Sequence, residues 1–233
     1  MLVILKRGGI LFLALLCIVS FLITKLFHPR AKDVFAENAS AIVIDAGHGG
    51  PDGGAVGRRG VLEKELNLEV SRLLAERLEE AGEAVVMKRT EDAGLYTSEN
   101  ASLREKKRED MKKRVEIAND TGNFCLISIH MNHFTDARYS GPQVFYQKGS
   151  AEGERLASEI RAAFLEVIGE HCTREIKPTT DLYILRKSEV PAVLVECGFL
   201  SNDAEEALLL DGVSREKLAE AICRGVENFK KEA

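Results

Sequence analysis

The sequence predicts one α/β domain built on a mostly parallel, mixed, six-stranded twisted sheet with helices on both faces. Two observations support this fold class. Short apolar runs rich in β-branched residues recur from residue 41 onward, as expected for buried strands. Segments with helical periodicity lie between these runs, and strands that alternate with helices of this length form parallel sheets covered on both sides.

Five of the predicted strands are clear and one is weaker. They are AIVIDA (41–46), AVVMK (84–88), CLISIH (125–130), QVFY (143–146), AVLVEC (192–197) and the weaker LYIL (182–185). Apolar stripes three or four residues apart predict two helices. The stripes are Leu66, Val70, Leu73, Leu74 and Leu78, and then Leu218, Ile222, Val226 and Phe229. The charged run 100–116 is interpreted mostly as a solvated helix face.

An apolar segment of a different kind precedes the domain. Lys6 and Arg7 are followed by an uncharged run of 17 residues, 8–24. This length is long for a signal peptide and near the lower limit for a transmembrane helix. A small-residue cleavage candidate, Ala39-Ser40-Ala41, lies far beyond the run, so we expect an uncleaved signal-anchor rather than a cleaved signal peptide. The remainder is exported in either case.

The expected organisation is an N-terminal segment (1–30), a linker (31–40) and a folded domain (41–233). Composition excludes several classes of protein. The net charge of −5 argues against binding of nucleic acid, which needs a basic surface. The five cysteines are widely spaced and form no CxxC, which excludes a disulfide framework and a cysteine zinc site. We expect them to be small buried hydrophobic residues.

Candidate functional residues gather where ligands bind in α/β sheets, beyond the carboxyl ends of the strands. His48 lies in DAGHGGPDGG after the first predicted strand, and His130 ends the third. Glu196 lies at the end of the apolar run AVLVE, and Glu63 begins the first long helix in GVLEKELNL. Two imidazoles and two carboxylates are therefore expected at one edge of the sheet.

These residue types are suited to zinc chemistry. A catalytic zinc ion takes three His, Asp or Glu ligands and lowers the pKa of water in its fourth position to about 7. His48, Glu63 and His130 would supply the ligands, and Glu196 could accept the proton of the water. Other interpretations remain open: His48 could belong to a phosphate-binding loop or a turn, and Glu63 could simply interact with the helix dipole.

At these residues the chain resembles the zinc-dependent N-acetylmuramoyl-L-alanine amidases, often called amidase type 3. The matching segments occur in the order of the family and span about residues 41 to 203. They are IVIDAGHGGPDGGAVG, GVLEKELNLEVSRLLAERL, KRTED, RVEIAND with LISIHMN, and VPAVLVECGFLSN. The resemblance implies one zinc ion per chain and hydrolysis of the amide between N-acetylmuramic acid and the L-alanine of the peptidoglycan stem peptide.

The resemblance also implies residue roles. His48, Glu63 and His130 fall on the metal ligands of the family, and Glu196 falls on its catalytic glutamate. Four further residues are expected to contact the substrate or support the ligands: His133, Asn132, Arg89 and Asn67. A histidine is unusual for the family at 133, and a fourth protein ligand would block the water position. His133 is therefore not expected to bind the metal, and a plain loop histidine remains an alternative.

Several departures resemble the sporulation-type amidases, which act on the spore cortex and lead to muramic-δ-lactam. These are the SIHMNHF sequence, the charged run, the short chain without a wall-binding repeat domain and the N-terminal segment. The expected partners are glycan strands and stem peptides, the membrane through residues 1–30, and an accessory activator protein. The alternatives are a vegetative cell-wall amidase, a zinc carboxypeptidase cutting elsewhere in the stem peptide, and a non-catalytic wall-binding module.

Overall fold

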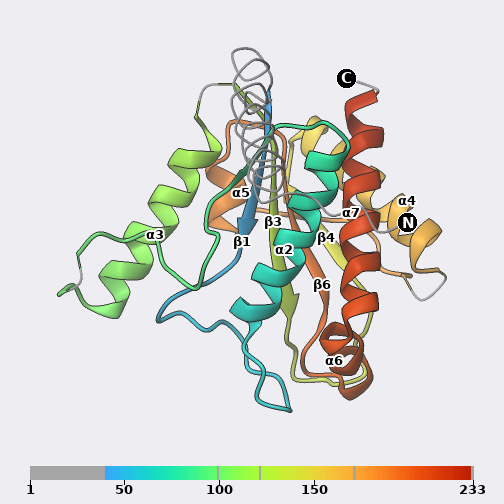
Figure 1. Ribbon diagram of the computed structural model, residues 1–233, viewed down its shortest axis with the longest axis horizontal. Helices are drawn as coiled ribbons and strands as arrows, with labels where there is room; N and C mark the ends of the chain where they lie inside the picture. Colours follow the sequence, from blue (N-terminus) through green and yellow to red (C-terminus); the bar gives the residue numbers. More distant parts are fainter. Residues whose placement is uncertain (1–39, 99, 121, 170–171, 232–233) are drawn as a thin grey trace, which may run out of the picture. The chain divides into compact units, whose positions relative to one another are not determined.

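The computed structural model describes residues 40–98, 100–120, 122–169 and 172–231, drawn as ribbons in Figure 1. The strands are β1 (Ala41–Ala46), β2 (Val85–Met87), β3 (Asn123–Asn132), β4 (Gln143–Gln147), β5 (Lys177–Thr179) and β6 (Ala192–Phe199). The helices are α2 (Glu63–Glu80), α3 (Leu103–Ala118), α4 (Ala151–Val167), α5 (Tyr183–Lys187), α6 (Asp203–Leu210) and α7 (Gly212–Lys231).

The expected signal-anchor, 1–30, and linker residues 31–39 lie outside the described residues. Among the helices that are described, none combines the length and the apolar character needed to cross a membrane.

The sheet has six strands in the order β2-β1-β3-β6-β4-β5. All neighbouring strands are parallel except β4 and β6, which are antiparallel. The predicted fold class, a mixed and mostly parallel sheet flanked by helices, is confirmed. The five clear strand predictions are also confirmed by β1, β2, β3, β4 and β6. Nearly every residue of β1 and β6 and the middle of β3 are buried, as their continuous apolar runs require.

The two faces of the sheet are covered unequally. Helices α2, α4 and α7 pack over one face and enclose the larger apolar core, and Figure 1 shows α2 and α7 running side by side. The other face carries a smaller cluster under α3 and α5. Side chains alternate between the faces along each strand. Val43, Leu126 and Leu194 therefore belong to the smaller cluster.

The weaker strand prediction, LYIL, is wrong. Tyr183–Lys187 forms the short helix α5, whose Ile184 and Leu185 are buried in the smaller cluster. A four-residue apolar run cannot be assigned to strand or helix by periodicity alone. The sixth strand is instead Lys177–Thr179, an edge strand that pairs with β4. It was missed because it has three residues, no apolar run and a proline.

The charged run forms α3, which begins with a capping box between Ser102 and Glu105. Most of its charged side chains are solvated, as expected, but Arg114 is only 2% exposed. Strand β3 continues two residues beyond the predicted end at His130, and the register of its pairing with β6 shifts between His130 and Asn132. The shift lies where the site residues leave the sheet.

Candidate active site

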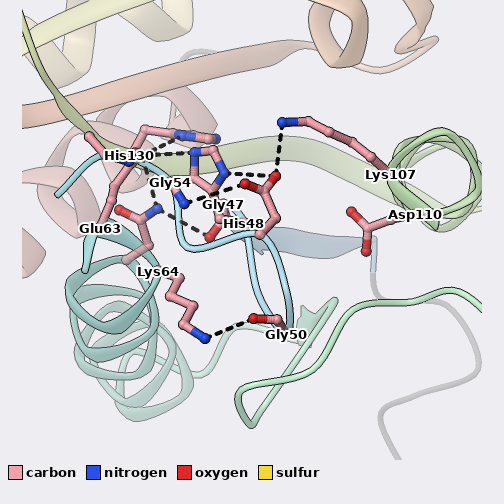
Figure 2. A network of polar contacts seen from close by, with 12 residues as sticks. Gly47, His48, Gly50, Gly54, Glu63, Lys64, Lys107, Asp110 and His130 are labelled. Atoms are coloured by element: carbon pink, nitrogen blue, oxygen red, sulfur yellow. Dashed lines mark hydrogen bonds and ion pairs between the residues drawn. The ribbon is translucent and has the colours of Figure 1, made fainter. Parts of the chain in front are cut away.

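Three side chains that can bind a metal lie together at the carboxyl ends of β1 and β3. One donor atom from each of His48, Glu63 and His130 lies within 4.8 Å of the others. Glu63 Oε1 is 3.1 Å from His48 Nε2 and 2.9 Å from His130 Nδ1. Figure 2 shows the two imidazoles converging on this carboxylate. The structure therefore brings together the three residues that the sequence proposed as ligands.

The loop after β1 places His48 in an unusual backbone conformation. His48 has a φ of 60°, in the left-handed region that costs a non-glycine residue about 1–2 kcal/mol. Two glycines allow ligand side chains to approach this loop. A Cβ on Gly47 would lie 2.3 Å from the imidazole of His130, and a Cβ on Gly54 would lie 2.5 Å from Glu63 Oε2. The glycine-rich motif thus makes room for the three ligand candidates.

Glu63 is the first residue of α2, and its carboxylate takes part in several hydrogen bonds. Oε2 accepts from the backbone N–H of Ala55 at 2.8 Å, and Oε1 accepts from Asn67 Nδ2 at 3.2 Å. Burial alone would raise the pKa of Glu63, but the hydrogen bonds and charges of His130 and His48 outweigh it and hold the pKa well below its usual range. Glu63 is therefore an anionic side chain at neutral pH.

His48 is flanked by a second carboxylate. Its Nδ1 lies 3.1 Å from Asp52 Oδ2, a close charge contact without the alignment of a hydrogen bond. Lys107 of α3, labelled in Figure 2, lies 3.0 Å from the same Asp52 oxygen. Burial would lower the pKa of His48, but the Glu63 and Asp52 carboxylates raise it. A carboxylate on the far nitrogen of a ligand histidine is a common way to fix the orientation of the ring.

Glu196 lies on β6, paired with His130 of this cluster, and one of its carboxylate oxygens has no hydrogen-bond partner among the residues that the structure describes. Its Oε2 is buried without a hydrogen bond, although the residue as a whole is only half-buried. It lines a cavity of about 480 Å³ between β4, β5 and the start of α5. The pKa of Glu196 is raised to about 7, mainly by burial; the imidazole of His130 opposes this rise and the Glu63 carboxylate adds to it. A carboxyl group that titrates near neutral pH is suited to transferring protons.

The remaining candidates are in different surroundings. His133 is exposed and does not belong to the metal-capable group. Asn132 ends β3, where its carbonyl accepts the N–H of Leu200. Asn67 is buried and donates to both Glu63 and the Gly47 carbonyl. Arg89 is buried beneath the glycine-rich loop, and its hydrogen bonds within the described ranges all go to backbone carbonyls.

Sequence reasoning missed three residues that contact the site. Arg114 donates to the carbonyl of His48 at 2.6 Å, Asp52 lies beside the His48 imidazole, and Lys107 contacts Asp52. Asp52 stands four residues after His48 in the glycine-rich motif, and Arg114 opens the segment RVEIAND. The positions of Asp52 and Arg114 within these motifs were the only indication in the sequence that they contact the site.

The donor set agrees with a zinc centre. Two imidazoles and one anionic carboxylate are ligands that catalytic zinc uses, and the unpaired carboxyl of Glu196 lies beside them. An open α/β sheet with this group at its carboxyl edge has the features of a metal-dependent hydrolase.

Comparison with known proteins identifies the family. The model of the Amidase_3 family, described as N-acetylmuramoyl-L-alanine amidase, matches residues 42–228. The chain therefore belongs to this family and is a peptidoglycan amidase.

Individual relatives agree with this assignment. The germination-specific N-acetylmuramoyl-L-alanine amidase of Bacillus subtilis (strain 168) is 36% identical over 188 residues, which are 81% of this chain and 78% of that protein. The amidase AmiA of Escherichia coli (strain K12) is 28% identical, over 87% of this chain and 80% of the relative. The CwlD amidase from Clostridioides difficile, solved in complex with the GerS lipoprotein, has a TM-score of 0.81 and 37% identity, over 83% of this chain and 100% of that chain.

Proposed function

We infer that this amidase holds one zinc ion on His48, Glu63 and His130 and uses Glu196 as its proton-transfer group. The observation that carries the proposal is the unpaired, buried carboxyl of Glu196 beside three convergent donors. Zinc bound there would supply a Lewis acid for the amide carbonyl and for water. The bond cleaved is the amide between the lactyl group of N-acetylmuramic acid and L-alanine.

Glu196 is suited to act first as a base and then as an acid. In the metal-free protein, burial raises the pKa of its carboxyl to about 7, so the environment of the group favours holding a proton. As a carboxylate it accepts a proton from the attacking water, and as the acid it returns the proton to the departing alanine nitrogen. Its neighbour His130 is its partner in the β3–β6 pairing, so the sheet itself sets the spacing between the proposed base and one of the proposed ligands.

Product analysis tests this reaction. Digestion of purified peptidoglycan by the full chain with zinc should release free stem peptides and leave intact glycan strands, identified by mass spectrometry. Shortened stem peptides still attached to muramic acid would indicate a carboxypeptidase instead. No product from a zinc-loaded, folded chain would favour a non-catalytic wall-binding module.

We further propose that the enzyme acts in maturation of the spore cortex, where removal of the stem peptide precedes formation of muramic-δ-lactam. The likeness to a germination-specific amidase and to CwlD supports this role over that of a vegetative wall amidase. A deletion strain should produce cortex without muramic-δ-lactam, and the wild-type gene should restore it. A variant with Glu196→Ala should not. Unchanged muramic-δ-lactam in the deletion strain would reject the role.

The same proposal includes the location of the enzyme and an accessory partner. Residues 1–30 serve as a signal-anchor and 31–40 as a linker, so the catalytic domain (41–233) works outside the cytoplasmic membrane. The apolar run 8–24 supports this arrangement. The complex of CwlD with a lipoprotein supports an accessory activator for this chain as well. Fractionation of cells expressing the full chain, followed by affinity purification, tests both points; release into the soluble fraction would reject the anchor.

A further inference from the structure

The site rests on a group of charged side chains that the proposed chemistry does not use. Asp45, Lys88, Arg89 and Arg114 are each at most 5% exposed. Buried ion pairs lose much of their attraction to the cost of removing charges from water, so apolar residues of similar volume often serve stability as well. Arg89 and Arg114 come from KRTED and RVEIAND, the two motifs to which the catalytic scheme assigns no role.

Arg114 connects α3 to the end of β1 and to the loop that follows. Its Nη1 donates to Asp45 Oδ1 at 2.8 Å and to the carbonyl of Ala46 at 2.9 Å. Its Nη2 donates to the carbonyl of His48 at 2.6 Å, and its Nε to Asp110 Oδ2 at 2.6 Å. Two carboxylates therefore orient the guanidinium while two carbonyls of the ligand loop accept from it.

Arg89 approaches the same stretch of backbone. Its Nε donates to the carbonyl of Ala46 at 2.8 Å, and its Nη2 donates to that of Gly47 at 2.9 Å. Together the two guanidiniums bond three consecutive carbonyls, those of Ala46, Gly47 and His48. This is the stretch in which the chain leaves the sheet and turns into the left-handed conformation of His48.

We propose that Arg89 and Arg114 form a guanidinium clamp on the carbonyls of residues 46–48, and that the clamp positions the imidazole of His48 for metal binding. The inference rests on the proposed metal site. The clamp acts through the backbone, so both arginines are positioning residues. Backbone held in an uncommon conformation persists where its surroundings determine it, and here hydrogen bonds to the carbonyls do so.

Lysine cannot replace either arginine in this clamp. A guanidinium presents five N–H donors in a rigid plane, whereas an ammonium is a compact charge that cannot span the same acceptors. Arg114→Lys and Arg89→Lys therefore keep the buried positive charge but remove the planar set of donors that bonds several carbonyls at once. A matched control is Arg215→Lys on α7, because Arg215 likewise bonds a backbone carbonyl, that of Leu209, and a carboxylate, that of Glu69.

The first readout is zinc affinity, measured on the full chain by competition with a chelator. Each clamp variant should bind zinc about 10- to 100-fold more weakly than the wild type, the usual effect of losing a group that supports a ligand. The control Arg215→Lys should bind as the wild type does. Asp110→Asn, which leaves both arginines but loosens Arg114, should change the affinity in the same direction and by less.

The second readout needs no metal. The amides of Gly49 and Asp52 bond to each other's carbonyls across the turn, so their hydrogen exchange reports opening of the loop. In metal-free protein, residues 46–54 should exchange faster in both clamp variants than in the wild type and the control. A role in global stability alone would lower the melting temperature and leave zinc affinity and local exchange unchanged.

The outcomes are distinct. Wild-type zinc affinity together with wild-type exchange in folded Arg114→Lys and Arg89→Lys would overturn the clamp. If Arg114→Lys fails to fold, Arg89→Lys and Asp110→Asn decide by the same two measurements. If the wild type binds no zinc, the proposed metal site has failed, and the exchange of residues 46–54 still tests the clamp by itself.

Discussion

His130 on β3 and Glu196 on β6 are direct partners in the pairing of two parallel strands, so their side chains leave the same face of the sheet next to each other. The candidate base is thus one strand away from a candidate ligand. The spacing between these two residues is set by strand pairing, so it does not depend on the conformation of a loop or on closure of the site. It provides a rigid basis for the predictions below.

Replacement of Glu196 by glutamine should separate metal binding from catalysis. Glu196→Gln keeps the size of the side chain and removes proton transfer, so turnover on peptidoglycan should fall by about 10²- to 10⁴-fold while zinc stays at one per chain. The control is Asp181→Asn, because Asp181 lines the same cavity; it should retain nearly normal turnover. Normal turnover in Glu196→Gln would remove the proposed role.

The same substitution should reveal a dependence of stability on pH in metal-free protein. The pKa of Glu196 is raised from 4.5 to about 7 by burial. Between these values the native state holds a proton that the unfolded state has lost, so the wild type loses stability as pH rises through this window. The loss is on the order of 3 kcal/mol above pH 7. Glu196→Gln has no carboxyl group at this position and should not lose stability in this window.

Chemical denaturation at pH 4.5 and pH 8, with chelator present, measures this effect. The free energy of unfolding of Glu196→Gln relative to the wild type should increase between the two pH values. A difference that does not change with pH would mean that the carboxyl titrates at its ordinary value.

The two histidines after CLIS should differ in metal binding. His130→Ala removes one of three ligands, so zinc content after dialysis should fall well below one equivalent. Excess zinc should also no longer raise its melting temperature. His133→Ala should retain one zinc and the thermal shift, because His133 lies outside the metal-capable group. The thermal shift arises because zinc binds the native state and so raises the free energy of unfolding, by about 2.7 kcal/mol at a free zinc concentration 100 times Kd. Equal loss of zinc in both variants would contradict the assignment.

Gly47 should tolerate no side chain. The Cβ of Gly47→Ala would lie 2.3 Å from the His130 ring, so either the ring or the loop must move. We expect weaker zinc binding and a loss of about 1–3 kcal/mol in the free energy of unfolding. Gly212→Ala, with nothing within 4 Å of the new Cβ, should leave zinc binding unchanged and cause no loss in the free energy of unfolding. Zinc titration and urea denaturation of both variants provide the comparison, and unaltered zinc binding in Gly47→Ala would refute this packing constraint.

Much of the site was accessible from the sequence because the carboxyl ends of parallel strands meet at one edge whatever the strand order. This rule placed His48, His130 and Glu196 together before β6 was known to lie beside β3. Residues whose role depends on tertiary contacts could not be found in this way. Arg114 is one of many charged residues in its run, and only the packing of α3 on β1 distinguishes it as buried.

Short helices and strands also could not be assigned from sequence patterns. Strand β5 has three residues, and its assignment depends on hydrogen bonds to β4. The apolar residues of α5 are buried against the sheet. A strand at the same place would also need apolar residues, so the sequence does not distinguish the two. Arg89 shows a third limit, because the sequence suggested that it contacts the substrate or supports the ligands without distinguishing the two, and its bonds to the carbonyls of Ala46 and Gly47 depend on the tertiary fold.

The order of the strands has a consequence for how activity arises. Strand β6 is the last strand in the chain, yet it lies between β3 and β4 and joins β1–β3 to β4–β5. It also carries Glu196. All three metal ligand candidates precede β6 in the chain, whereas the proposed base lies on β6 itself. On the proposed mechanism, hydrolysis therefore requires the last strand to be in place between β3 and β4.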